Sequence, residues 1–211
     1  MVISHWLRVV LIIMKDLLCT YFLALIAIAF CACSDSELPT GGEGGASEFV
    51  DSRDSRIYKT VEIGGRVWMA ENLNYYDSDD SLYNRTHCFK DCASYCEKQG
   101  RLYAWNVSMV ACPAGWELPS KADFDSLLAS VGGGATAADS LTARGFINDV
   151  KGGYYFIGYS SFFDEYAYFW TRDEVRANNA RSVILENGRS SISYDETYEE
   201  FGLSVRCIKK Q

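Results

Sequence analysis

After residue 33, the side chains best suited to catalysis or metal binding are five cysteines and a single histidine. His87 precedes Cys88, and Cys92 and Cys96 follow at three-residue gaps, so a metal site on these four residues is conceivable. Zinc ribbons instead separate paired cysteines by two residues, which argues against zinc here. A lone histidine without a nucleophile-elbow glycine pattern does not indicate a Ser-His-Asp enzyme. We therefore predict no catalytic residue, no metal site and no cofactor.

Acidic side chains are numerous, and two of them could form the carboxylate pair of a glycosidase. Because the whole chain is acidic, no single pair is informative. The segment Asp77–Asp80 alternates acids but lacks the glycine and the terminal glutamate of an EF-hand calcium loop. We therefore expect neither glycosidase catalysis nor calcium binding from the acidic residues. They include Asp77, Asp79, Asp80, Asp164, Glu165, Asp173, Glu174, Asp195, Glu196, Glu199 and Glu200.

Aromatic residues are concentrated between residues 154 and 168, at a higher density than one core face requires. Exposed rings can stack on sugars or grip a protein partner. We predict Tyr155, Tyr159, Phe162 and Tyr166 as ligand-stacking residues, and packing beneath a loop is the alternative for each of them. A formal net charge of −8 argues against nucleic acid as a partner, because binding to phosphates requires clustered Lys and Arg.

The first 32 residues have the pattern of a signal peptide. The apolar run of residues 17–30 follows Lys15 and is too short to span a bilayer, which needs about 20 residues. The start of translation could be Met1 or Met14. Cys33 follows a small residue, Ala32, and we predict that Cys33 is lipidated; cleavage after Ala32 and secretion is the alternative. Lipidation would place the protein in the cell envelope, at the outer membrane or the cell surface.

Residues 33–54 are rich in Gly, Ser and acids and poor in apolar residues, which predicts a disordered tether. Residues 55–211 are then long enough for one domain with a single core. Disulfides are the default for cysteines in an exported protein. Because five cysteines is an odd number, at least one is unpaired or pairs between chains.

Residue patterns in the domain predict an α+β fold. Residues 57–63 alternate apolar and polar side chains, Gly64-Gly65 forms a turn, and residues 66–69 return as the second strand of a hairpin. Residues 74–98 lack periodicity and are expected to form a long loop. Residues 102–110 fit a short helix or a buried strand equally well.

A helix is expected after Ser120, which forms a capping box with Asp123 and precedes one apolar face before the glycines at 132–134. A second short helix is expected near 136–143. The last third predicts antiparallel strands at 153–158, 167–171, 180–185, 191–194 and 203–208.

Six strings follow one another along the domain: TVEIGGRVWMAENLN at 60–74, GRLYAW at 100–105, ACPAGWELPS at 111–120, GGY at 152–154, FWT at 169–171 and GLSVRCI at 202–208. Together they resemble the Fibrobacter succinogenes major paralogous domain family. Gln99 replaces a usual Tyr and Glu117 a usual His. The strings cover nearly the whole domain, so the resemblance is specific.

The resemblance implies an exported lipoprotein with a C-type lectin-like domain. It also implies the disulfides Cys88–Cys96 and Cys112–Cys207 and leaves Cys92 as an extra thiol. We expect a non-enzymatic module that binds a glycan or a protein. A structural or adhesive coat protein is the alternative, and a polysaccharide-active enzyme is a more distant one.

Overall fold

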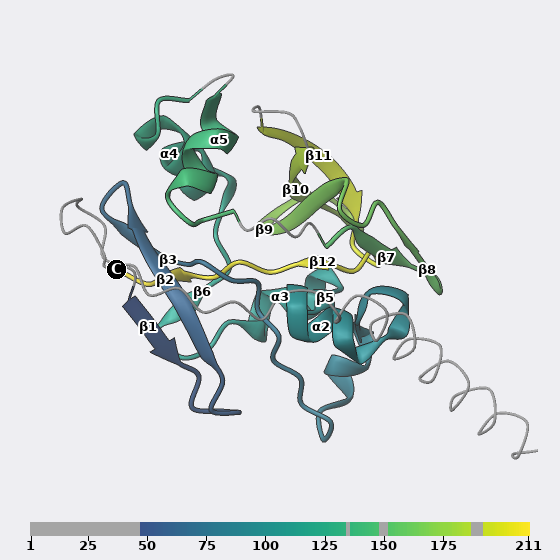
Figure 1. Cartoon of the computed structure of the whole chain (residues 1–211). Helices are drawn as coiled ribbons and strands as arrows, with labels where there is room; N and C mark the ends of the chain where they lie inside the picture. Colours follow the sequence, from purple (N-terminus) through teal and green to yellow (C-terminus); the bar gives the residue numbers. More distant parts are fainter. Residues whose placement is uncertain (1–46, 134–135, 148–151, 187–191) are drawn as a thin grey trace, which may run out of the picture.

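The computed structural model describes residues 47–133, 136–147, 152–186 and 192–211 (Figure 1). The predicted signal peptide at residues 1–32, Cys33 and residues 34–46 of the predicted tether lie outside these ranges. No helix in the described ranges is both long and apolar enough to cross a membrane.

Two antiparallel-rich sheets form the framework, with a separate two-stranded hairpin beside them. The five-stranded sheet has the order β1 (Ser47–Val50), β2 (Ile57–Ile63), β3 (Arg66–Met69), β13 (Ile208–Lys209) and β6 (Trp116–Glu117). The six-stranded sheet has the order β11 (Ile192–Tyr198), β10 (Asn179–Glu186), β9 (Tyr166–Arg176), β12 (Leu203–Ser204), β5 (Leu102–Tyr103) and β4 (Thr86–His87). The hairpin pairs β7 (Tyr154–Phe156) with β8 (Tyr159–Ser161).

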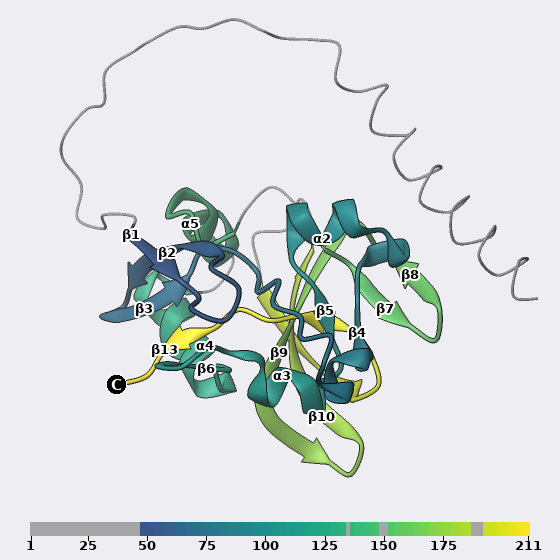
Figure 2. The same cartoon turned by 90° about the horizontal axis from the view of Figure 1, so that it is seen from below.

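Short helices cover the sheets on two sides (Figures 1 and 2). α4 and α5 lie together above the five-stranded sheet in Figure 1, whereas α2 lies beside β5, and α3 begins two residues after β5 ends. The bounds are η1 (Ser81–Arg85), η2 (Phe89–Asp91), α2 (Ala93–Gln99), α3 (Trp105–Ala111), α4 (Lys121–Ser130) and α5 (Ala137–Ala143). These helices and sheets confirm the predicted α+β class, and the C-type lectin-like assignment stays a prediction.

The C-terminal segment joins the two sheets. It contributes β12 to the six-stranded sheet, crosses the centre of the molecule, and ends as β13 in the five-stranded sheet (Figure 1). Arg206 and Cys207 lie between these two short strands and are both buried. Contacts made by these two residues therefore fix the two sheets relative to each other.

Two apolar clusters share the same strands. Trp68 packs against Phe124 of α4 in one cluster, while its neighbour Met69 belongs to the other. Phe169 and Trp170 of β9 divide in the same way. Successive side chains of a strand point to opposite faces, so a strand buried on both faces serves two cores.

Several elements match their predictions. β2 and β3 have the expected bounds, and both glycines of the connecting turn have positive φ values of 62° and 71°. The Ser120–Asp123 capping box is present with both reciprocal hydrogen bonds at the start of α4. α5 confirms the second short helix. Residues 102–110, left open between helix and strand, contain both β5 and most of α3.

The boundary predicted between tether and domain is wrong. Ser47–Val50 form β1, which pairs antiparallel with β2, and Phe49 packs against Trp116 at 5.0 Å between ring centroids. Asp51 is fully buried and is bonded to Arg53. Pairing with β2 supplies the backbone hydrogen bonds that composition alone could not predict, so residues 47–54 belong to the domain.

The predicted loop at 74–98 is also more ordered than expected, because it contains η1, β4, η2 and most of α2. In the last third, the strand predicted at 153–158 is only the first arm of the β7–β8 hairpin. β9, β10 and β11 extend beyond their predicted ends. The prediction at residue 191 falls outside the described residues.

Candidate ligand-binding surfaces

The β7–β8 hairpin carries two of the four predicted ligand-stacking residues, Tyr155 and Tyr159, and Phe162 follows directly after it. Its register pairs Tyr154 with Ser161, Tyr155 with Ser160 and Phe156 with Tyr159. Tyr154, Phe156 and Tyr159 consequently share one face, and Tyr155 lies on the other. The hairpin is tied to the six-stranded sheet by reciprocal backbone hydrogen bonds between Tyr155 and Gly202 at 3.0 and 2.7 Å.

The tip of the hairpin is a two-residue turn with positive φ at both positions, 47° at Ile157 and 82° at Gly158. Gly or Asn normally occupies such positions, and a β-branched residue there is strained. Ile157 is nevertheless 73% exposed, and Tyr159 beside it is 76% exposed. The chain therefore holds an apolar side chain in water in a conformation that costs about 1–3 kcal/mol.

An aromatic cluster supports this tip. Phe156 stacks on Phe201 at 4.1 Å between ring centroids, and Tyr198 approaches Phe156 edge-on at 6.4 Å. Phe162 contacts Tyr166 at 5.1 Å. Phe162 and Tyr198 remain 42% and 43% exposed, so the apolar surface continues from the tip onto both neighbours. We call Ile157, Tyr159, Phe162 and Tyr198 the hairpin surface.

The opposite face of the hairpin closes a small pocket of about 230 Å³. Tyr155 stacks on His87 at 3.7 Å between ring centroids and 12° between planes, and both residues line this pocket with Arg85 and Glu200. Arg85 and Glu200 form an ion pair across it. Burial lowers the pKa of His87, and the nearby Asp91 opposes this shift. At neutral pH the stack is therefore between two uncharged rings.

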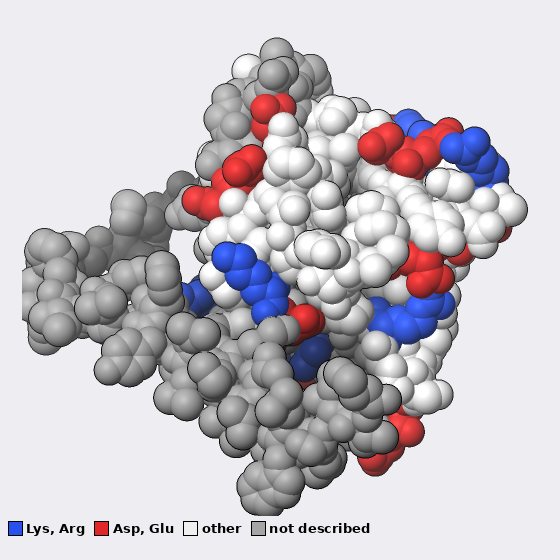
Figure 3. Space-filling view, turned by 90° about the vertical axis from the view of Figure 1, so that its right-hand side faces the viewer, with Lys and Arg blue, Asp and Glu red and all other residues white. Residues whose placement is uncertain are grey.

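The side of the molecule that carries β7 and β8 presents a broad uncharged area, with acidic and basic side chains along its borders (Figure 3). The hairpin surface adds four exposed large side chains on this side of the molecule, and exposed apolar surface of this kind is typical of an interaction site.

The structure brings together only part of the predicted stacking set. Tyr159 and Phe162 are exposed on the hairpin surface, and Tyr166 supports Phe162 from below while remaining partly buried. Tyr155 lies on the other face, where it packs on His87. Ile157 and Tyr198 were missed, because neither stands out by residue type before the turn geometry is known.

The cysteines form the two disulfides that the resemblance implied. Cys88 bonds to Cys96 and Cys112 bonds to Cys207, across 8 and 95 residues of sequence. Cys92 is disulfide-bonded as well, so the prediction of an extra thiol is wrong. Within the described ranges, no group of three or more His, Cys, Asp or Glu side chains is arranged to hold a metal ion.

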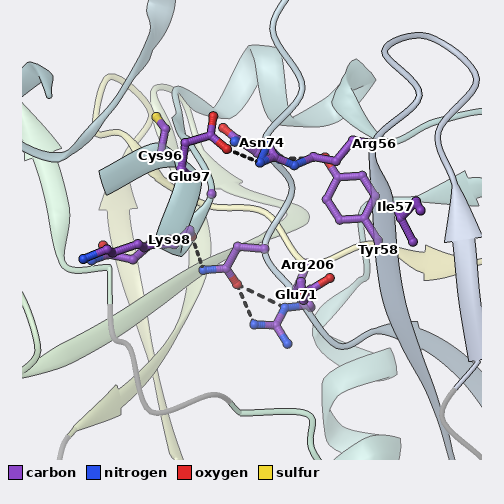
Figure 4. A pocket seen from close by; sticks show the side chains of 12 residues that line it. Arg56, Ile57, Tyr58, Glu71, Asn74, Cys96, Glu97, Lys98 and Arg206 are labelled. Carbon is purple, nitrogen blue, oxygen red and sulfur yellow. Dashed lines mark hydrogen bonds and ion pairs between the residues drawn. The ribbon is translucent and has the colours of Figure 1, made fainter. Parts of the chain in front are cut away.

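A second pocket, of about 190 Å³, lies between α2, the start of β2 and the segment after β3. Figure 4 shows the Arg56–Glu97 ion pair on one side of it and Arg206 with Glu71 on the other. Arg206 donates hydrogen bonds to the Asn72 side-chain oxygen and to the backbone oxygen of Phe146. Burial lowers the pKa of Arg206 to about 9, and the charge of Glu71 opposes this shift.

Comparison with known proteins places these features in a family. Residues 61–209 match the sequence model of the Fibrobacter succinogenes major domain. The chain belongs to this family. No curated protein and no solved structure matches the chain.

Within this Fibrobacter succinogenes major domain, five of the twelve residues that line the 190 Å³ pocket come from the strings that carried the resemblance. Glu71, Asn72 and Asn74 come from the first string, Gly100 from the second and Arg206 from the last. The sequence analysis used these residues only for the family resemblance and did not predict that they line a pocket.

Proposed function

We propose that this member of the Fibrobacter succinogenes major domain family is an exported, non-enzymatic binding module, tethered to the cell envelope by a lipid on Cys33. Membership of this family supports the proposal that the domain is associated with the cell surface. The hairpin surface would contact a glycan outside the cell. Its partners are therefore a membrane, through the anchor, and an extracellular ligand.

The observation that carries this proposal is the backbone at Ile157. Strained residues persist where the surrounding structure over-determines them, and they are concentrated at functional sites. Here the strain keeps two large side chains, Ile157 and Tyr159, exposed at 73% and 76% beside a pocket. A hairpin that served only as a spacer would gain stability from Asn-Gly at the same turn.

A glycan suits this region because the hairpin offers an open ring on one face and polar side chains on the other. Tyr159 offers a ring face, and Asn84, Arg85 and Glu200, around the pocket on the other face, can bond hydroxyl groups. A protein partner is the second candidate, and the exposed aliphatic side chain of Ile157 favours it.

A glycan array and a pull-down from extracellular material, both with the purified full-length protein, test the proposal. We expect binding to a defined glycan class that is competed by the soluble glycan. Capture of a single stoichiometric protein would instead select the second candidate. If neither experiment retains a ligand, the domain is a spacer or coat protein and the proposal is wrong.

The anchor is tested separately. Cys33→Ser should release the protein from the membrane fraction while the signal peptide is still removed, and Cys31→Ser should not. A Cys33→Ser protein that stays with the membrane after cleavage would contradict lipidation at this position.

A further inference from the structure

Four aromatic rings contact one another in a closed series where the β7–β8 hairpin meets β9. Tyr154 lies 5.6 Å from Phe162 and 5.7 Å from Tyr168, measured between ring centroids. Phe162 lies 5.1 Å from Tyr166, which lies 5.8 Å from Tyr168. Phe162 is 42% exposed and the three tyrosines are half-buried, so the rings reach the surface. We call these four residues the β9 surface, which shares Phe162 with the hairpin surface.

The turn between β8 and β9 holds part of this surface in an unfavourable backbone conformation. Phe162 and Asp164 both have positive φ values, of 59° and 60°. Residues other than glycine rarely adopt this conformation, and such strain is concentrated at functional sites. The backbone nitrogens of Glu165 and Tyr166 both donate to the backbone oxygen of Phe162, at 3.2 and 3.1 Å. The turn therefore fixes an acidic side chain between two rings of the β9 surface.

A second acidic side chain projects from the same face of the six-stranded sheet. Tyr168 of β9 stands opposite Ile184 of β10. Ser182, two residues before Ile184, stands opposite Asp195 of β11. Opposed residues of adjacent strands point to the same side of a sheet, as do residues two apart on one strand. Asp195 is therefore on the face that carries Tyr168, and it is exposed.

Neither of these two acids has a cationic partner in the part of the chain that the structure describes. Glu165 and Asp195 are both exposed, and the ion pairs between described residues involve other acids. Burial raises the pKa of Tyr168 to about 12, and the charges of Asp195 and Glu165 add to this shift. Both carboxylates therefore act on the ring of Tyr168.

The electrostatics of the β9 surface favour a cation. The faces of aromatic rings carry partial negative charge and attract cations, and nearby carboxylates strengthen this attraction. The cation–π contacts among the described residues all involve rings outside this surface. The formal net charge of −8 for the whole chain also favours a positively charged ligand over a negatively charged one.

We propose that the glycan bound beside the hairpin carries a free, protonated amino group, as an amino sugar without an acetyl group does. This inference rests on the function proposed above and narrows its ligand class. The apolar face of the sugar ring stacks on the rings of the β9 surface, and the ammonium group pairs with Glu165 and Asp195. N-acetylation removes the charge but leaves the sugar ring, so it should remove only the electrostatic part of binding.

Calorimetric titration of the full-length protein with chitosan oligosaccharides, and with the same oligosaccharides after N-acetylation, tests the charge at a pH that keeps the amine protonated. We expect the free amine to bind about five- to tenfold more tightly, and added salt should reduce this preference. Glu165→Gln/Asp195→Asn removes both charges with little change in shape and should abolish the preference. Glu48→Gln/Asp79→Asn is the matched control, because it removes two exposed acids of β1 and of the segment before η1.

Each outcome decides the inference. A preference for the amine that Glu165→Gln/Asp195→Asn loses and the control keeps supports it. Equal binding of the two oligosaccharides overturns the amino-sugar class and leaves glycan binding as proposed. A preference that both double variants keep, or that both lose, shows that these two acids do not recognise the amine and also overturns it. Binding of neither oligosaccharide overturns the inference alone if the glycan array finds another ligand, and overturns the proposed glycan function as well if the array finds none.

Discussion

Asn72 and Arg206 lie 134 residues apart in the chain, yet the Asn72 side-chain oxygen accepts hydrogen bonds from Arg206 Nε at 3.1 Å and from Nη2 at 2.6 Å. The Asn72 side-chain nitrogen donates to the backbone oxygen of Gln99 at 2.8 Å. One amide thus connects the segment after β3, the end of α2 and the segment between β12 and β13. The buried guanidinium also contacts the rings of Phe146 and Phe169.

Loss of the Asn72 amide should be among the most destabilising changes in the domain. Asn72→Leu removes the side-chain acceptor of the buried Arg206 cation and leaves it only the backbone oxygen of Phe146, and we expect a loss of about 3 kcal/mol in the free energy of unfolding. Denaturant unfolding measures it. In Asn72→Leu/Arg206→Met the buried charge is removed as well, so part of the loss should be recovered. A double variant that loses the sum of the two single effects would contradict this coupling.

The two disulfides should differ in their contribution to stability. Cys112–Cys207 closes 95 residues and Cys88–Cys96 closes 8. On the chain-entropy account these loops correspond to about 4–5 and about 2.5 kcal/mol. Thermal unfolding of Cys112→Ala/Cys207→Ala and Cys88→Ala/Cys96→Ala compares them. An equal or smaller effect of the longer loop would contradict the assignment of Cys207 as the link between the sheets.

The turn at the hairpin tip should trade stability for binding. Ile157→Asn places a residue suited to positive φ before Gly158, and we expect unfolding to become about 1 kcal/mol less favourable. The same change removes an exposed apolar side chain and should weaken ligand binding about five- to tenfold. Ile157→Val keeps the strain and most of the apolar surface, so it should change neither quantity much. Equal binding by the Asn and Val variants would show that the strain has no function.

Alkaline pH should destabilise the domain through Tyr58. Burial raises the pKa of Tyr58 to about 12, while its hydroxyl accepts a hydrogen bond from the Asn74 backbone nitrogen. Because this pKa is higher in the folded than in the unfolded protein, its contribution to stability is complete below pH 10 and is lost as the pH rises toward 12. A pKa difference of about two units corresponds to about 3 kcal/mol in the free energy of unfolding.

Tyr58→Phe isolates this contribution from other groups that titrate in the same range, including Arg206. At pH 7 the variant should be less stable by about 1 kcal/mol, because the Asn74 N–H loses its acceptor. The difference from the unchanged protein, measured by urea unfolding, should shrink above pH 10. A difference that is constant from pH 7 to pH 12 would show that Tyr58 does not titrate in this way.

Sequence patterns correctly predicted the elements that are determined by residues close together in the chain. The alternation in β2, the Gly64-Gly65 turn and the Ser120–Asp123 capping box each depend on a few neighbouring residues. The seven-residue helix α2 has no apolar stripe, and it lies beside η2, to which Cys88–Cys96 ties it, so periodicity could not reveal it. β1 depends on pairing with β2, which composition does not report.

The candidate sites were predictable only in part, for the same reason. The density of aromatic residues located the hairpin surface. The residues at its tip could not be predicted, because isoleucine at position 157 is not a residue type that indicates a turn. The pocket beneath α2 required the tertiary structure, because the residues that line it come from different segments of the chain.

The account depends most on the claim that the hairpin surface binds the extracellular ligand. Once the array or pull-down has supplied that ligand, calorimetric titration should compare Tyr159→Ala with Val50→Ala. Val50 is 55% exposed on β1, across the molecule from β7 and β8 (Figures 1 and 2). We predict at least tenfold weaker binding for Tyr159→Ala and unchanged binding for Val50→Ala, with equal melting temperatures. Equal affinities in the two variants would contradict the claim.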